Sequence, residues 1–154
     1  MRVDSRTVVY LHAVLPKHGG EWSSTVNSEN FLIRGTTSTK VKAFVPARDF
    51  DQSRRFYQDL GFELGWFDDS LAYFRHGHSS FFVQNFYNND HAGNLMMHLL
   101  VVDVEAWWQH TQDQDLQNKY QIKVEPPENK PWGIREFVII DPNGVLWRIG
   151  ENTR

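Results

Sequence analysis

Residues 131–149 give the most informative pattern in the chain and read Pro-Trp-Gly-Ile-Arg-Glu-Phe-Val-Ile-Ile-Asp-Pro-Asn-Gly-Val-Leu-Trp-Arg-Ile. An apolar run over residues 138–140 leads into Asp-Pro-Asn-Gly at 141–144. Proline fixes φ for a turn, and Asn-Gly tolerates positive φ. The order predicts two strands, Arg135 to Ile140 and Val145 to Ile149, joined by a tight turn.

Two helices are predicted upstream, each introduced by an aspartate after a short apolar strand. Asp49 is the expected N-cap of a helix from about residue 50 to residue 60, and Gly61 is its stop signal. Asp103 opens the second helix in the same way, after the apolar strand over residues 99–102. The two caps stand 54 residues apart, which indicates an internal repeat.

Short extended segments with turn residues between them follow each helix. They are Phe62 to Phe67, Leu71 to Arg75 and Ser80 to Phe86 in the first half, and Tyr120 to Val124, Arg135 to Ile140 and Val145 to Ile149 in the second. We interpret residues 40–154 as one α+β domain of two βαβββ modules, at about 40–90 and 94–152, whose curved mixed sheets each leave a hollow face.

Three motifs carry a resemblance to a known family. They are Pro-Ala-Arg-Asp-Phe-Asp at 46–51, Phe-Tyr-Gln-Asp-Leu-Gly-Phe at 56–62, and the Pro-Trp-Gly-x-Arg-Glu-Phe to Asp-Pro-x-Gly ending at 131–144. In this order they resemble the vicinal oxygen chelate superfamily, and within it the glyoxalase and bleomycin resistance protein branch. The resemblance covers about residues 40–152. It implies that two chains pair around a two-fold axis to complete each hollow, so a homodimer is expected.

The resemblance also indicates where metalloenzymes of the superfamily keep their metal ligands. A histidine of the first strand corresponds to Lys42, and a carboxylate of the last strand corresponds to Arg148. Neither side chain offers a lone pair at neutral pH. The remaining positions fall near Gln84 and near Met96, with His98 two residues on and on the same strand face. One histidine does not make a metal site, so we expect no metal ion and no cofactor.

The expected site is therefore an apolar cup with a few polar groups, which suits a mid-sized organic ligand. Aromatic surface is expected from Tyr73, Phe82, Phe86, Trp132, Phe137 and Trp147. The candidate ligand-binding residues are Lys42, Phe82, Gln84, His98, Trp132, Glu136 and Arg148. By resemblance, the expected function is metal-independent binding that sequesters a bleomycin-like or other planar cationic antibiotic.

Other interpretations remain open from the sequence alone. Aromatic residues on strands are more often core than ligand contacts, and Lys42 and Arg148 are able to pair with Glu136 as structural groups. The fold also supports a lyase, isomerase or dioxygenase, acting through a displaced metal site or through His98 and Glu136 as an acid–base pair. A third alternative is an interaction module whose cup is filled by its own side chains or by a partner.

Composition narrows the class of partner. The chain has 154 residues, is 40% hydrophobic and contains no cysteine, so disulfides and thiolate metal sites are excluded. The net charge is −3 for the whole chain, which disfavours nucleic acid and favours a cationic ligand. No apolar run approaches the length of a membrane span. We expect a cytoplasmic protein that binds a small molecule and neither nucleic acid nor membrane.

The first 39 residues differ in composition from the rest of the chain. Residues 8–14 form a short apolar run, followed by Pro16, Gly19-Gly20 and a stretch rich in Ser, Thr and Asn. A secretory signal would have a longer apolar core and a small-residue cleavage site. The segment is expected to be an N-terminal extension of unknown role: an added strand, a flexible extension or a by-product of where translation starts. Residues 31–33 are its best candidates for packing.

Overall fold

The chain divides into residues 1–39 and a compact unit over residues 40–154. The computed structural model describes residues 40–153, so the expectations for the N-terminal extension and its residues 31–33 lie outside the described residues. Among the described helices, none has the length and apolar character needed to span a bilayer.

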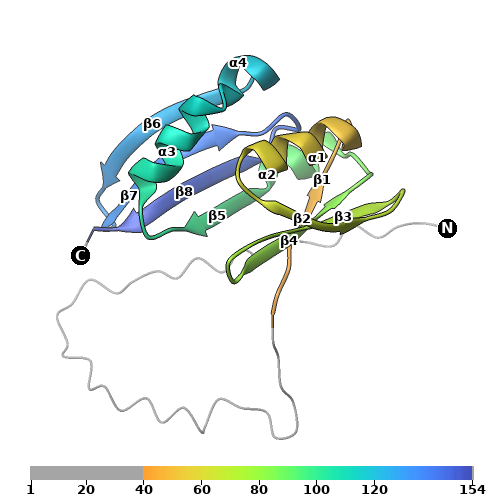
Figure 1. Cartoon of the computed structure of the whole chain (residues 1–154), viewed down its shortest axis with the longest axis horizontal. Coiled ribbons are helices and arrows are strands. Elements are labelled where there is room, and N and C mark those ends of the chain that lie inside the picture. Colours follow the sequence, from red (N-terminus) through yellow and green to blue (C-terminus); the bar gives the residue numbers. More distant parts are fainter. Residues whose placement is uncertain (1–39, 154) are drawn as a thin grey trace, which may run out of the picture. The chain divides into compact units, whose positions relative to one another are not determined.

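Two βαβββ modules make up the described unit (Figure 1). The first contains β1 (Phe44–Pro46), α1 (Phe50–Asp59), β2 (Glu63–Phe67), β3 (Leu71–His76) and β4 (Ser79–Gln84). After the short helix α2 (Asn89–Asn94), the second contains β5 (Met96–Leu100), α3 (Val104–Asp113), α4 (Leu116–Tyr120), β6 (Lys123–Lys130), β7 (Ile134–Ile140) and β8 (Leu146–Asn152).

Each module forms its own four-stranded mixed sheet. The strand orders are β1-β4-β3-β2 and β5-β8-β7-β6. In each sheet the first strand of the module pairs in parallel with the last strand, β1 with β4 and β5 with β8. The other strand pairs are antiparallel. The predicted α+β fold of two βαβββ modules is confirmed.

The predicted helix starts are confirmed by their capping bonds. The Asp49 side chain accepts a hydrogen bond of 2.8 Å from the backbone N–H of Gln52, and Asp103 accepts one of 2.9 Å from Ala106. Each bond satisfies a backbone donor that the first helical turn leaves free. Gly61 has φ of +114°, a conformation that favours glycine, and so ends α1 where the sequence predicts.

The second module differs from the sequence expectation around α4 and β6. Tyr120 was expected to begin a strand, but it ends α4, and β6 continues through Pro126-Pro127 to Lys130. The prolines are tolerated because β6 is the edge strand of its sheet, where N–H groups on one side need no partner. The pairing with β7 shifts register between Glu125 and Glu128, which is where the prolines lie.

A ring cluster joins the two modules. Trp147 of β8 lies 5.7 Å from Tyr57, 5.5 Å from Phe62 and 5.1 Å from Phe81 between ring centroids. Trp147 is only 2% exposed and Phe137 is fully buried. The expectation that these two rings offer ligand-binding surface is therefore wrong. Both point to the helix-covered side of their sheet and belong to the core.

Candidate functional site

Each sheet has one face against the shared core and one face directed away from it. Side chains alternate along a strand, so Phe74 and Phe81 point into the core while Tyr73 and Phe82 point to the other side. We call the second side of the first sheet the ring-lined face, defined by Lys42, Phe44, Trp66, Tyr73 and Phe82. The corresponding side of the second sheet is the arginine face, defined by His98, Trp132, Glu136 and Arg148.

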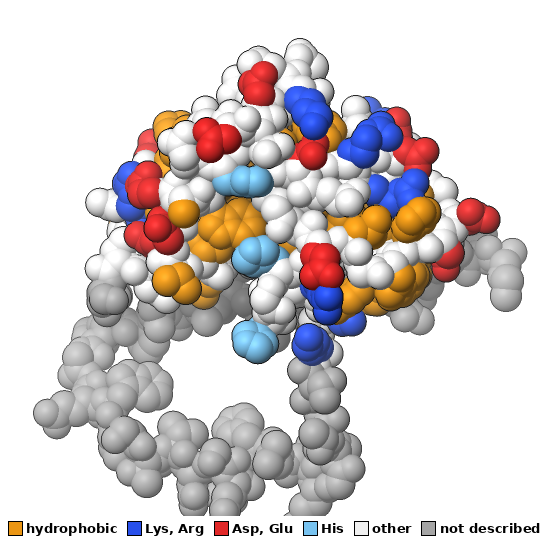
Figure 2. Space-filling model, viewed as in Figure 1, with side chains coloured by type: hydrophobic (Ala, Val, Ile, Leu, Met, Phe, Trp, Pro, Cys, Tyr) orange, Lys and Arg blue, Asp and Glu red, His pale blue; other side chains and the backbone are white. Residues whose placement is uncertain are grey.

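The ring-lined face is an array of aromatic side chains in mutual contact. Phe44 stacks on Phe82 with centroids 5.0 Å apart, and Trp66 lies 6.0 Å from Phe82 and 6.4 Å from Tyr73. Phe44 is 45% exposed and Trp66 is 47% exposed. In Figure 2 hydrophobic side chains gather at the surface in the region of β2 and β3. Rings exposed at this level are available to stack against a planar ligand.

Lys42 brings a positive charge to this array. Its ammonium lies 4.4 Å from the centroid of the Tyr73 ring and 5.0 Å from that of Phe82. These distances are those of a cation–π contact. Lys42 precedes β1 by two residues, so the first-strand position that resemblance assigned to it lies just outside the strand.

Phe44 and Trp66 are not among the candidates predicted from the sequence. Phe44 was recoverable, because it follows Lys42 by two residues and so shares its side of an extended segment. Trp66 was not, because the pairing of β2 with β3 shifts register between Leu64 and Trp66. A bulge of this kind changes which side chains share a face.

Gly65, at this irregularity, lies directly against Tyr73. A Cβ atom at Gly65 would approach Cδ1 of the Tyr73 ring to 2.8 Å, closer than side chains tolerate. The absence of a side chain at this position therefore lets the Tyr73 ring lie over the β2 backbone.

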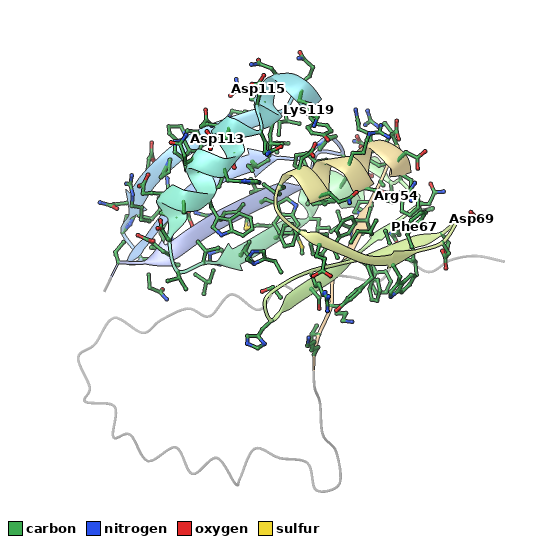
Figure 3. The ribbon with its side chains drawn as sticks, viewed as in Figure 1. Arg54, Phe67, Asp69, Asp113, Asp115 and Lys119 are labelled. Atoms are coloured by element: carbon green, nitrogen blue, oxygen red, sulfur yellow. The ribbon has the colours of Figure 1, made fainter. Side chains whose placement is uncertain are left out.

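The other side of the first sheet carries the helix α1 and a separate exposed ring. The guanidinium of Arg54 lies 3.8 Å from the centroid of Phe67, and Figure 3 shows these side chains together between α1 and the end of β2. Phe67 is 53% exposed. It lies on the same strand as Trp66 but does not belong to the ring-lined face.

The arginine face is organised around an ion pair. The Arg148 guanidinium pairs with Glu136, whose side chain is almost completely buried, and lies 5.0 Å from the centroid of the Trp132 ring. His98 stands opposite Arg148 in the pairing of β5 with β8. The structural alternative considered for Arg148, that it pairs with Glu136, is confirmed. For Lys42 it is not, since the structure places that residue over Tyr73 and Phe82 instead.

Gly150 is required for this arrangement. It pairs with Glu136 across β7 and β8, and a Cβ atom there would come within 2.7 Å of Cγ2 of Ile134 and 2.8 Å of Cβ of Glu136. Glycine therefore leaves the space in which the Glu136 side chain lies. Gly150 is not among the residues predicted from the sequence, because a glycine inside a strand does not reveal what approaches it.

The seven predicted site residues fall into two groups in different modules. Lys42, Phe82 and Gln84 belong to the first module, and His98, Trp132, Glu136 and Arg148 belong to the second. The sheets share a core through Trp147 and Phe81, so the two candidate faces are both directed away from it.

His98 also borders a cavity at the junction of the modules. The cavity has a volume of about 400 Å³ and is lined by His98, Phe81 and Trp147, together with residues that precede β1. Its walls come from the core side as well as from β5. It is therefore separate from the rings of Phe44 and Trp66.

The side chains at the family's metal positions do not fit a divalent cation. Lys42 and Arg148 are cationic donors, and Arg148 is already bound to Glu136. Within residues 40–153 no three side chains of His, Cys, Asp or Glu are placed to share a metal ion. No catalytic step through a metal follows from these residues.

Comparison with known proteins supports the fold assignment. The model of the Glyoxalase/Bleomycin resistance protein/Dioxygenase superfamily matches residues 40–149. No curated protein matches the chain at a significant level.

Solved structures resemble the described unit. A bleomycin-binding protein complexed with bleomycin has a TM-score of 0.65 at 22% identity, with 75% of this chain and 99% of that chain covered. An antibiotic-binding protein from a Streptomyces species has 0.61 at 21%, with 76% and 98% covered. A lactoylglutathione lyase from Agrobacterium tumefaciens has 0.55 at 18%, with 75% and 95% covered. At these identities the similarity shows the fold alone.

The match of the family model covers most of the chain, and the two βαβββ modules agree with it. The chain belongs to the Glyoxalase/Bleomycin resistance protein/Dioxygenase superfamily.

Proposed function

We propose that this protein binds a planar aromatic small molecule without a metal ion, and that the ring-lined face supplies the main contact surface. The observation that carries the proposal is the exposure of Phe44 and Trp66 beside Tyr73 and Phe82. Large exposed rings in one array are unusual for a surface without a partner. Stacking against a flat ligand would remove them from water.

A homodimer would complete the site. Pairing around a two-fold axis would set the ring-lined face of one subunit against the arginine face of the other, and so form two equivalent pockets. Each pocket would then contain rings on one wall and the Arg148–Glu136 pair with Trp132 on the other. Sedimentation of the full chain tests this part: a strict monomer at micromolar concentration would contradict it.

The solved structures support the class of ligand without naming it. Two of the proteins similar in fold are a bleomycin-binding protein and an antibiotic-binding protein. Sequestration of a bleomycin-like or other planar antibiotic is accordingly the finer form of the proposal. Bleomycin belongs in the first panel of compounds tested.

The enzymatic alternative has less support from the geometry. An acid–base pair of His98 and Glu136 needs a carboxylate that is free to exchange protons. Glu136 is instead buried and bound to Arg148. The side chain facing His98 across the strands is Arg148.

Calorimetric titration of the full chain with bleomycin and a panel of planar aromatic compounds tests the proposed function. Trp66→Leu should weaken binding by about tenfold, because a stacked ring contributes roughly 1 kcal/mol or more. Phe67→Leu is the matched control: its ring is exposed on the same strand but lies against Arg54, so binding should be unchanged. Equal affinity in both variants and the unchanged protein would contradict the proposal.

A further inference from the structure

The charge of the ligand can be inferred from the groups that already occupy the ring-lined face. An array of aromatic faces attracts cations, because the π-electron surface is negative. Here that place is taken by the chain itself, since the Lys42 ammonium lies over both Tyr73 and Phe82. A cationic ligand would have to displace Lys42 or lie next to it against electrostatic repulsion.

Lys42 has no acidic partner among the residues that the structure describes. No carboxylate of residues 40–153 forms an ion pair with its ammonium, and Glu63 on β2 is bound to Arg75. The Tyr73 hydroxyl lies in the same positively charged surroundings. Its pKa is lowered from the ordinary value by a hydrogen bond with Ser80 and then, against partial desolvation, by the positive charges of Lys42, Lys40 and Arg75.

The arginine face does not offer a free carboxylate either. Glu136 is the acidic residue among the candidate ligand-binding residues, and Arg148 neutralises it. On β6, at the edge of the same sheet, Glu125 pairs with Lys123 at 2.6 Å and Glu128 pairs with Lys130 at 2.8 Å. Of the charged side chains named on the two faces, Lys42 is therefore the one that is not paired with a carboxylate. The negative charge of the whole chain is spread over other surfaces and is screened beyond roughly 8 Å at physiological salt.

We propose that the ligand is a planar aromatic acid, whose carboxylate, sulfonate or phosphate group pairs with Lys42 while its ring system stacks on the exposed rings of Phe44 and Trp66. This inference rests on the proposed function and reverses the cationic ligand that net charge and resemblance favour. Two rings hold the Lys42 ammonium in place, so its charge is already positioned when the ligand arrives. Stacking on the rings provides the contact area with the ligand, and the ion pair with Lys42 makes the site prefer an anionic ligand.

Three probes with the same ring system separate charge from stacking. They are naphthoate, naphthylmethanol and naphthylmethylammonium, each titrated by calorimetry into the full chain at low salt. The expected order of affinity is acid, then alcohol, then amine, with about tenfold between acid and alcohol for a charge-assisted contact. The affinity for the acid should fall as salt is added, while that for the alcohol should stay constant.

Variants of Lys42 locate the effect. Lys42→Met should reduce the affinity for naphthoate to that for the alcohol and should raise the affinity for the amine, because the repelling charge is gone. Lys42→Arg should keep the preference for the acid. Lys119→Met is the matched control, since Lys119 lies on α4, on the helix side of the sheets (Figure 3), and pairs with Asp59. It should leave all three affinities unchanged.

The possible failures point to different conclusions. If the amine binds as tightly as the acid to the unchanged protein, the inferred ligand charge is wrong while ring binding stands. If the acid is preferred but Lys42→Met keeps that preference, the assignment to Lys42 is wrong. If none of the three probes nor bleomycin binds, both the inference and the proposed function are overturned. Thermal unfolding of each variant shows that it is folded before it is titrated.

Discussion

The hydroxyl of Tyr57 donates a hydrogen bond of 2.5 Å to Oδ2 of Asp141, and both groups are buried. Tyr57 belongs to α1 of the first module, and Asp141 begins the turn between β7 and β8 of the second. The other oxygen of Asp141 accepts bonds of 2.8 Å from the backbone N–H groups of Asn143 and Val145. The Asp-Pro-Asn-Gly turn thus has two roles: it joins two strands, as the sequence predicts, and it fastens one module to the other.

Replacing Tyr57 with phenylalanine should destabilise the protein by about 1–3 kcal/mol, because a buried carboxylate loses its hydroxyl donor. The indole N–H of Trp147, which donates to the Tyr57 hydroxyl at 3.2 Å, also loses its acceptor. Urea unfolding followed by circular dichroism measures the change. Tyr73→Phe, which removes a hydroxyl from the open side of the first sheet, should change the free energy of unfolding by less than about 0.5 kcal/mol. Equal losses in the two variants would contradict the role assigned to Tyr57.

Titration of Asp141 should contribute to the pH dependence of the free energy of unfolding. Burial raises the pKa of this carboxyl, and its hydrogen bonds only partly oppose that effect. A raised folded-state pKa means that the contribution to stability is full below the unfolded value of about 3.9 and is lost as pH rises through the folded value. The free energy of unfolding of the unchanged protein, relative to Asp141→Asn, should therefore fall as pH rises through this window. Urea unfolding across a pH series measures it, and a difference that rises with pH would contradict it.

Asp59 should show the opposite sign in the same experiment. Burial acts to raise its pKa, but the hydrogen bonds from Lys119 and Tyr120 outweigh burial and lower it. Its contribution is therefore present above the unfolded value and is lost as pH falls through the lowered folded value. The stability advantage of the unchanged protein over Asp59→Asn should shrink in acid. An advantage that is constant down to the acid-unfolding limit would contradict the assignment.

Gly150→Ala should disturb the arginine face. The new methyl group would overlap Ile134 and Glu136, and forcing an added carbon into packed surroundings costs about 1–3 kcal/mol. Gly93→Ala is the control, because nothing lies within 4 Å of a Cβ atom at that helical position. It should leave stability unchanged or raise it slightly. Thermal unfolding compares the two, and an equal effect would show that the space beside Gly150 is not needed.

Much of the fold was predictable because local signals agree with the final structure. Asp49 and Asp103 cap helices that start where the sequence places them, and Gly144 in the β7–β8 turn has φ of +94°. The course of β6 was not predictable, because Pro126-Pro127 are strand-breaking signals except at a sheet edge. Edge position is a property of the whole sheet and cannot be read from the segment itself.

The site was predictable only in part, for a similar reason. Alternation along β4 places Phe81 in the core and Phe82 on the other face, and the ion pair of Arg148 with Glu136 agrees with the structural alternative for that residue. The sequence places Lys42 and Arg148 in different modules, but it could not show that both candidate faces are directed away from a shared core, because that depends on how the modules pack through Trp147. Nor could it show that Arg148 and Lys42 have different partners, a carboxylate for one and aromatic rings for the other.

The most direct test of the central claim is calorimetric titration of the purified full chain with bleomycin and the three naphthalene probes, before and after treatment with EDTA, with metal content measured on the same samples. We expect that at least one probe binds, that its affinity is unchanged by EDTA, and that Trp66→Leu weakens it. A stoichiometric bound Ni, Zn, Fe or Mn ion, together with loss of ligand binding when that ion is removed, would contradict the account.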